Sequence, residues 1–406
     1  MTPHVSATLR PMDGEGRSGP EVLLFTIDAG GGHRAAARAL AAAAEEARTP
    51  LRLRVESFQQ TLLPLDVLKR ATGLSLEDAY NTILRRHWSA LMVPLLRVMH
   101  AAIRVRRPAI VRTLAAWLRE QPRPAAVVSV LPNFNGVMRD AIREAIPGVP
   151  LVVVLTDFAD FPPRFWIETG IDRVVVGTDE ARAQAVAIGI PPERVSRVSG
   201  MVMHPRFYRA GGAAARDRAR AGLSLGDGDF AVTLLFGGKG SPEMAPLAQR
   251  LLEADTAIRV IAVCGDNPAL FERLAPVEAR AGGRLVRLGF TDRVAEVLAA
   301  SDLLVTKPGP GSLSEAFHQR VPVVVTRNLH TIPQERFNTD FVRDRGLGVV
   351  VAHRREIPAA VLSLYRDAAG RAAMRDRIAA LPPNRAVFEV IDVIAGEAGV
   401  TPSSHQ

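Results

Sequence analysis

The chain has 406 residues, of which 48% are hydrophobic, and it carries a formal net charge of +9. This length suits two domains of about 150 to 200 residues, and the positive charge favours an anionic partner. The sequence contains no run of about 18 uncharged apolar residues, so a membrane-spanning helix is not expected. The single cysteine excludes an internal disulfide. Residues 1–20 have no apolar stretch typical of a secretory signal and are expected to be a disordered tail.

The first predicted element is a buried parallel strand, because residues 22–28 form an almost continuous apolar run. Three glycines follow it, Gly30, Gly31 and Gly32. His33 then opens an alanine-rich helix at 35–47. The spacing is not that of a dinucleotide motif, so a nicotinamide cofactor is not expected. A histidine at a helix N-terminus is either structural or, with a lowered pKa, a neutral general base. The glycines favour the second interpretation.

A basic segment comes next. Residues 69–123 contain eleven Lys or Arg against three acids. Arg97, His100, Arg104 and Arg107 are spaced to share one helical face, and Pro94 and Pro108 are expected to divide the segment into short helices. Two interpretations stay open: a helix face that lies on an anionic membrane surface, or a solvated face on helices packed against the core. Nucleic-acid binding is not expected, because no recognised module is present.

Strands are predicted at 126–130 and 151–155, with a helix at 135–146 between them. The second strand leads to Asp157, which would lie at the carboxyl edge of the sheet, where open α/β sheets bind ligands. Asp157 either assists His33 or caps the strand. A third strand follows at 174–176, and a helix capped by Thr178 comes after it.

A polar, Gly- and Ala-rich stretch at 210–229 predicts a linker. It ends in Asp227-Gly228-Asp229, a D-x-D pattern of carboxylates that can bind a divalent metal. We expect no metal there, because the pattern falls in a turn before a strand. The alternation then restarts with a strand at 230–236 and a second glycine-rich loop, Gly237 to Ser241, and continues with strands at 258–264 and 285–290.

The most informative stretch is 301–338. A strand at 303–305 is followed by a Gly/Pro loop, a helix from Leu313 to Arg320 and another strand at 321–325. A glycine-rich turn at a helix N-terminus binds anions, and a diphosphate would fit there. Glutamine, glutamate and asparagine side chains follow the last strand and are suited to binding hydroxyl groups: Gln334, Glu335 and Asn338.

GGGHR at 30–34, LTDF at 155–158, KPGPGSLSEAF at 307–317 and QERFN at 334–338 together resemble one group of glycosyltransferases. The group includes monogalactosyldiacylglycerol synthases, processive diacylglycerol glucosyltransferases and the N-acetylglucosaminyltransferase of peptidoglycan synthesis. The resemblance implies a GT-B α/β fold, two Rossmann-like domains facing across a cleft. The acceptor domain would be 21–209 and the donor domain 230–380, with a helix at 381–400 crossing back to the first domain.

The resemblance also implies an inverting transfer, in which His33, assisted by Asp157, removes a proton from the acceptor. The expected donor-binding residues are Gly238, Lys239, Gly240, Phe290, Lys307, Gly309, Gly311, Ser312, Glu315, Gln334, Glu335 and Asn338. Gly30, Gly31, Gly32 and His204 would line the acceptor side. His204 stands where the group has an arginine, and Val202 replaces a proline, so His204 or Arg206 must compensate if that arginine holds diphosphate.

The predicted function is hexose transfer from a UDP-sugar to a lipid, with diacylglycerol as the expected acceptor. UDP-sugar is a co-substrate, and no metal or other cofactor is expected. The expected partners are an anionic membrane surface and the lipid acceptor, and the expected location is cytoplasmic and peripheral, on the inner face of the cell membrane. The alternatives are transfer to a polyprenyl-linked or soluble acceptor, a hydrolysing nucleotide-sugar epimerase, and a non-catalytic nucleotide-sugar binder.

Overall fold

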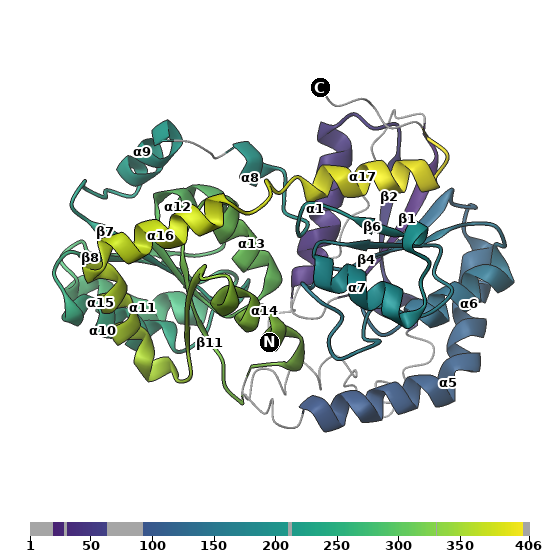
Figure 1. The fold of residues 1–406 in the computed structure, drawn as a ribbon, viewed down its shortest axis with the longest axis horizontal. Helices are drawn as coiled ribbons and strands as arrows, with labels where there is room; N and C mark the ends of the chain where they lie inside the picture. The colour runs from purple at the N-terminus through teal and green to yellow at the C-terminus, as the bar shows by residue number, and fades with distance from the viewer. Residues whose placement is uncertain (1–18, 28–30, 63–91, 210–212, 330, 401–406) are drawn as a thin grey trace, which may run out of the picture.

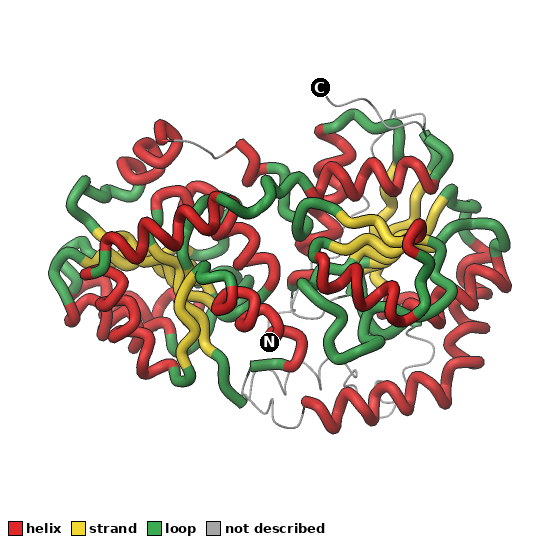
Figure 2. Tube along the Cα trace, viewed as in Figure 1, coloured by secondary structure: helices red, strands yellow, loops and turns green. Residues whose placement is uncertain are grey.

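The structure is a computed structural model, and it describes residues 19–27, 31–62, 92–209, 213–329 and 331–400. Two α/β units lie side by side, each built around one six-stranded sheet (Figures 1 and 2). Within these residues no helix is both long and apolar enough to cross a membrane.

The first sheet is entirely parallel, in the order β2-β1-β3-β4-β5-β6. Its strands β3 and β4 are buried on both faces, which explains their unbroken apolar sequences. The strands are β1 (Glu21–Thr26), β2 (Arg52–Ser57), β3 (Ala126–Ser129), β4 (Leu151–Val154), β5 (Arg173–Val176) and β6 (Val195–Arg197).

The second sheet is also parallel, in the order β12-β11-β10-β7-β8-β9. Its central strands β7 and β10 are fully buried. The strands are β7 (Phe230–Leu235), β8 (Ile258–Val263), β9 (Leu285–Leu288), β10 (Leu303–Thr306), β11 (Val323–Thr326) and β12 (Gly348–Val351). The predicted α/β fold with two Rossmann-like sheets is confirmed. The sequence interpretation missed β6 and β12, which are short edge strands.

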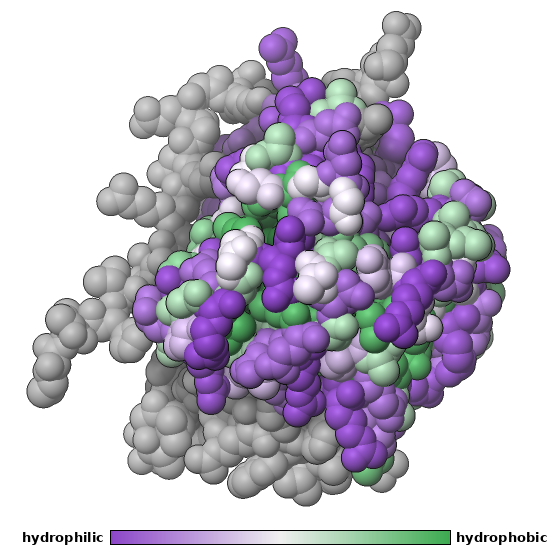
Figure 3. All heavy atoms as spheres, turned by 90° about the vertical axis from the view of Figure 1, so that its left-hand side faces the viewer, coloured by the Kyte–Doolittle hydropathy of each residue, from purple (hydrophilic) through white to green (hydrophobic). Residues whose placement is uncertain are grey.

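Helices cover the faces of both sheets (Figure 2). The first unit contains α1 (Gly32–Glu46), α2 (Phe58–Thr61), α5 (Met92–Glu120), α6 (Asn135–Ala145), α7 (Asp179–Ile188) and η3 (Pro192–Arg194). The second contains α9 (Ala213–Gly222), α10 (Met244–Ala254), α11 (Pro268–Arg280), α12 (Val294–Ala300), α13 (Pro310–His318), α14 (Pro333–Asp344), η4 (Arg354–Glu356), α15 (Ile357–Arg366) and α16 (Ala368–Ala379). Seen from its outer side, the second unit is covered mostly by hydrophilic side chains (Figure 3).

Each sheet has one point where the strand order reverses direction, between β1 and β3 in the first and between β7 and β10 in the second. Loops at the carboxyl ends of the two strands diverge at such a point and leave room for a ligand. The loop before His33 follows β1, and the loop containing Lys307 follows β10. The topology therefore puts both predicted half-sites at reversal points.

The chain passes between the units twice, through α8 (Arg206–Arg209) and again before α17 (Ala386–Glu397) (Figure 1). The two passages are bonded to each other: Asn384 Nδ2 donates to the Met201 carbonyl oxygen at 3.0 Å, and the Arg385 N–H donates to Ser199 Oγ at 2.7 Å. Apolar side chains of α17 join the core under α1 and the first sheet. The final helix thus packs on the first unit.

The prediction that prolines divide the basic segment is wrong where the structure describes it, because α5 runs continuously from Met92 to Glu120. Pro94 lies near the start of the described part of α5, and Pro108 is exposed, so water can solvate the carbonyl that loses its donor. The predicted shared face is only partly directed to solvent: His100 Nε2 lies 2.6 Å from Asn133 Oδ1 and Arg107 Nη2 donates to Asp140 at 2.7 Å, whereas Arg104 is exposed. Lys69, Arg70, Arg85 and Arg86 lie outside the described residues.

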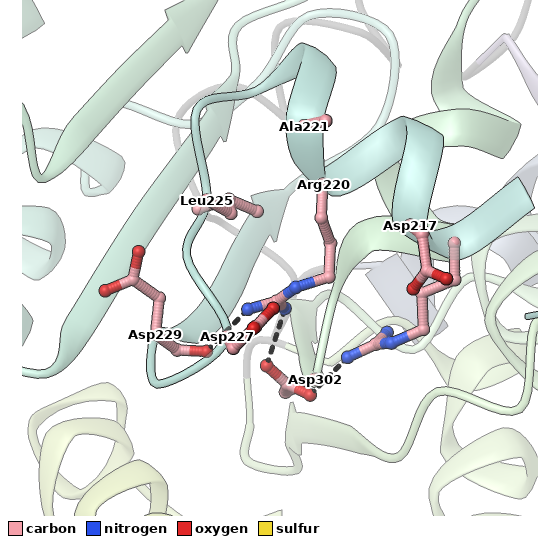
Figure 4. A pocket seen from close by; sticks show the side chains of 8 residues that line it. Asp217, Arg220, Ala221, Leu225, Asp227, Asp229 and Asp302 are labelled. Carbon is pink, nitrogen blue, oxygen red and sulfur yellow. Dashed lines mark hydrogen bonds and ion pairs between the residues drawn. The ribbon is translucent and has the colours of Figure 1, made fainter. Parts of the chain in front are cut away.

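The predicted linker contains a helix, α9, that is attached to the second unit. Buried Asp302 accepts from Arg220 at 3.3 Å, as Figure 4 shows, and also from Arg216 at 2.7 Å and Arg375 at 3.0 Å. In the D-x-D turn beside them, Asp229 is used structurally, because it pairs with Arg259 at 2.9 Å and accepts the Gly226 N–H at 2.7 Å. The pocket in Figure 4 lies at the amino end of β10, whereas the predicted donor loop follows its carboxyl end.

Candidate functional site

His33 lies in the first turn of α1, after Gly31, whose φ of +84° is readily available only to glycine. Its Nδ1 lies 2.9 Å from the Val130 carbonyl oxygen and 3.3 Å from Thr156 Oγ1. Because a carbonyl can only accept, Nδ1 carries the proton and Nε2 keeps its lone pair. Burial lowers the pKa of His33 to about 4, although the Val130 carbonyl opposes this shift. At neutral pH His33 is an uncharged imidazole with a free acceptor nitrogen.

Asp157 follows β4 and accepts a hydrogen bond from Trp166 Nε1 at 2.8 Å. The Trp166 ring lies beside the His33 ring, with 5.6 Å between centroids. Asp157 is therefore linked to His33 indirectly: it accepts from the indole of Trp166, and that ring lies beside the imidazole. The imidazole itself is hydrogen-bonded to Val130 and Thr156. Burial raises the pKa of Asp157 to about 7, against the opposing hydrogen bond from Trp166.

Trp166 is itself held in place by Asp160, which is 1% exposed. Asp160 accepts from the Trp166 backbone N–H at 2.7 Å and from the Arg164 N–H at 2.9 Å. Burial raises the pKa of this carboxyl, while these N–H groups lower it. The sequence interpretation missed Asp160, although two acids and two aromatics within ten residues after the end of β4 were a usable signal.

On the second unit, the predicted glycine loops meet at the reversal point. A Cβ on Gly265 would lie 2.1 Å from the Gly238 carbonyl oxygen, so the loops after β7 and β8 are in close contact. The Lys239 carbonyl oxygen accepts from Asn267 Nδ2 at 2.9 Å, and the Lys239 side chain is exposed. Lys307 Cε lies 3.3 Å from the position of a Cβ on Gly237. Two backbone loops and a lysine thus border one space.

Helix α13 begins directly after this loop, with Gly309 at its N-cap and Pro310 at its first position. Gly311, Ser312 and Glu315 are its more open positions, whereas Leu313, Ala316 and Phe317 are buried. Burial raises the pKa of Glu315 to about 8, and the charge of Arg206 opposes this shift. The N–H groups at a helix N-terminus can bind an anion. A carboxyl without an ion-pair partner, one turn further along the same face, can bind a hydroxyl group.

Helix α14 supplies the remaining polar groups. Lys307 Nζ pairs with Glu335 Oε1 at 3.3 Å. Gln334 is 6% exposed, and its Oε1 has no hydrogen-bond partner, which is an unsatisfied acceptor beside the loop. Asn338 is completely buried and donates from Nδ2 to the Pro308 carbonyl oxygen at 2.8 Å. Asn338 therefore braces the loop through Nδ2, while its Oδ1, like Oε1 of Gln334, has no hydrogen-bond partner.

The two half-sites face each other across the domain interface. The negative charge of Glu335 raises the pKa of Asp157, and the positive charge of Lys307 lowers it, so these groups of the second unit lie within electrostatic reach. Next to them, Phe158 and Phe341 are in contact, with 4.7 Å between ring centroids. Arg345 Nη2 pairs with Glu180 at 2.6 Å and stacks on Phe341. The structure thus brings His33, Trp166 and Asp157 to the same interface as Lys307 and Glu335.

Four other predicted residues remain: His204, Phe290, Gly30 and Gly32. His204 lies at the first passage between the units, where its Nδ1 accepts the Arg206 N–H at 3.3 Å and its charged neighbours are Arg206, Arg209 and Glu46. Phe290 is 75% exposed on the loop after β9. Gly30 lies outside the described residues, while Gly32 is exposed at the start of α1. Over the described part of the chain, no three His, Cys, Asp or Glu side chains gather in a metal-like group.

Comparison with solved structures shows which class of fold the chain has. The chain has the fold of GT-B glycosyltransferases: it superposes on Acinetobacter baumannii MurG with a TM-score of 0.55 at 13% identity, covering 93% of this chain and 99% of that one. It also superposes on Neisseria meningitidis UDP-GlcNAc 2-epimerase bound to UDP-GlcNAc, with a TM-score of 0.58 at 10% identity, covering 93% and 100%. At these identities the likeness establishes the fold alone.

Sequence comparison finds similarity to proteins named for glycosyl transfer to diacylglycerol. Residues 33–202 match the family model described as monogalactosyldiacylglycerol (MGDG) synthase. The chain is 29% identical over 252 residues to the processive diacylglycerol beta-glucosyltransferase of Bacillus subtilis, covering 62% of this chain and 63% of that protein. It is 25% identical over 363 residues to the chloroplastic monogalactosyldiacylglycerol synthase of Spinacia oleracea, covering 86% and 66%. The predicted resemblance to this group of proteins is confirmed, although the matches span less than two thirds of each relative's length.

Proposed function

We propose that the chain is a UDP-sugar-dependent glycosyltransferase that moves a hexose to the hydroxyl group of diacylglycerol with inversion. One observation carries the proposal: a neutral histidine with a free Nε2 and the anion-binding N-terminus of α13 come from the reversal points of two sheets that share one interface. The relatives' names, which specify diacylglycerol glycosyl transfer, support the acceptor.

In the proposed reaction, Nε2 of His33 takes the hydroxyl proton as the acceptor oxygen attacks the anomeric carbon. The bond from that carbon to the phosphate oxygen breaks, and UDP leaves with the electron pair. Attack from the side opposite the leaving group inverts the anomeric centre. Val130 fixes the imidazole tautomer, and Asp157 holds the Trp166 ring that lies beside His33.

The leaving diphosphate would lie at the N-terminus of α13, near Gly309, Gly311 and Ser312, with Lys307 and Lys239 as charge partners. Glu315 would bind the ribose. Gln334 and Glu335 would bind the sugar, because Gln334 has an unsatisfied buried oxygen and Glu335 is fixed by Lys307. We propose no metal, because the helix N-terminus and the lysines supply the positive potential.

The acceptor would arrive from a membrane surface along α5. In its described part the exposed side chains include Arg104, Val105 and Arg112, and Val105 is 80% exposed. Each basic residue near an anionic bilayer contributes roughly 1 kcal/mol, and the apolar side chain can enter the headgroup region. We propose peripheral binding to the inner, cytoplasmic face of the cell membrane.

The test is glycolipid formation by the purified protein. It is incubated with UDP-glucose or UDP-galactose and vesicles of diacylglycerol and anionic phospholipid, with and without a chelator, and products are identified by mass spectrometry. Monohexosyl diacylglycerol is expected, unaffected by the chelator. His33→Ala is expected to lose about 10²- to 10⁴-fold in turnover while UDP binding is retained. Glycosylation of only a polyprenyl-linked or soluble acceptor would refute the diacylglycerol assignment, and unchanged behaviour of His33→Ala would indicate a non-catalytic binder.

A further inference from the structure

Arg206 extends from the first passage between the units into the second unit. It lies in α8, and its Nη1 donates to the Asp292 carbonyl oxygen at 2.7 Å, in the turn between β9 and α12. Within the described residues this is the one side-chain hydrogen bond recorded for Arg206. The remaining N–H groups of the guanidinium are available on a side chain that is already anchored.

Helix α8, which carries Arg206, packs against α13: Gln319 Nε2 donates to the Phe207 carbonyl oxygen at 3.2 Å, and the rings of Tyr208 and His318 lie 4.9 Å apart. The charge of Arg206 opposes the rise that burial causes in the pKa of Glu315, and the two side chains form no ion pair within the described structure. Gly311 and Ser312 precede Glu315 by four and three residues, so they lie on the same face, about one turn or 5.4 Å nearer the helix N-terminus. An arginine side chain can span that distance. Arg206 therefore lies on a helix that packs against α13, and it forms no ion pair with an acid among the described residues.

The neighbouring His204 does not provide a comparable charge. Its Nδ1 accepts the Arg206 N–H, which requires this nitrogen to be unprotonated. Burial lowers the pKa of His204, and the charges of Arg206 and Arg209 lower it further. Arg209, in the same turn of helix, points to the first unit and pairs with Glu46 at 2.6 Å. Of the three basic side chains of this turn, Arg206 is the one directed to the second unit.

We propose that Arg206 binds the diphosphate of the nucleotide-sugar donor with paired N–H groups, opposite the backbone N–H groups that begin α13. This inference rests on the proposed function, because it takes a nucleotide diphosphate as the ligand. Two parallel charge-assisted hydrogen bonds suit a guanidinium and a phosphate, whereas a lysine offers a point charge. The donor would then contact both the passage between the units and the second unit, so its binding joins them.

The experiment is calorimetric titration of the full chain with UDP and, separately, with uridine. The variants are Arg206→Ala and Arg206→Lys, with Arg209→Ala as the matched control, because it removes the same charge from the same helical turn. We expect Arg206→Ala to weaken UDP binding at least tenfold and uridine binding less than twofold. Arg206→Lys should be intermediate, and Arg209→Ala should bind UDP within twofold of the wild type.

A structural role for Arg206, through the Asp292 turn alone, would weaken UDP and uridine binding equally, and that result would overturn the inference. Unchanged UDP binding by Arg206→Ala would overturn it as well. Thermal unfolding of each variant verifies that the fold is intact. Wild-type protein that binds no UDP would overturn the proposed function and this inference together, whereas UDP binding that survives Arg206→Ala overturns the inference alone.

Discussion

Replacing Asp157 by asparagine should change how stability depends on pH. The folded-state pKa of Asp157 is about 7, raised from 3.8, because the carboxyl is buried and Glu335 is near. Between these two values the folded chain binds a proton that the unfolded chain releases, so this group stabilises the fold at low pH and the contribution is lost as pH rises through 7. Two pH units below the folded pKa, the contribution is about 2.7 kcal/mol at 1.36 kcal/mol per unit.

The expected result is that the free energy of unfolding of the wild type, relative to Asp157→Asn, falls by about 2 to 3 kcal/mol from pH 5 to pH 8. Asparagine can still accept the Trp166 N–H, so the local packing is kept. Urea unfolding followed by tryptophan fluorescence is a suitable assay, because Trp88, Trp117 and Trp166 all lie in the N-terminal half of the sequence. Asp376→Asn, an exposed position on α16, is the control. A difference between wild type and Asp157→Asn that stays constant across this range would refute the reasoning.

Three further predictions concern the interface. The variant Asp157→Asn removes the titration of Asp157, so that protonation of His33 can be followed in the pH profile of kcat/KM. Because the pKa of His33 is about 4, kcat/KM of this variant should not fall through protonation of His33 between pH 8 and pH 5.5. A fall centred near pH 6.5 would contradict this. Asn338→Leu should raise the KM for the UDP-sugar severalfold while stability changes by about 1 kcal/mol, since it removes the bond to Pro308; an unchanged KM would count against a bracing role. Phe341→Ala should increase the radius of gyration in small-angle scattering, because it removes the ring contact with Phe158 between the units, and no increase would argue that this contact does not hold them together.

Much of the fold could be predicted because parallel strands that are buried on both faces have continuous apolar sequences. The strands that begin at Glu21, Leu151 and Phe230 are of this kind. The edge strand β12 was missed, since Gly348–Val351 is only partly buried and too short to stand out. The continuous helix through Pro108 was missed because exposure, which makes a proline tolerable inside a helix, is a tertiary property.

The site was predictable in its residue types and less so in its contacts. The glycines before His33 indicated a loop beside a ligand, but the partner that fixes the imidazole is a backbone carbonyl, that of Val130, which no side-chain pattern reveals. The contact of Asn338 with sugar stays a prediction, and its bond to Pro308 could not be predicted because it is set by how α14 packs. Trp166 and Asp160 matter because a loop folds back on itself after β4.

The two bonded passages between the units limit how the molecule can move. A single connection would leave the orientation of one unit relative to the other little restricted. Here the two connections are bonded to each other, Ser199 to Arg385 and Met201 to Asn384, which restricts the relative orientation of the units. Any separation of the units has to keep both attachments, which restricts how Lys307 and Glu335 can move relative to Asp157. A chain cut before Leu381 would keep one attachment and lose this restriction, even with every residue of both half-sites present.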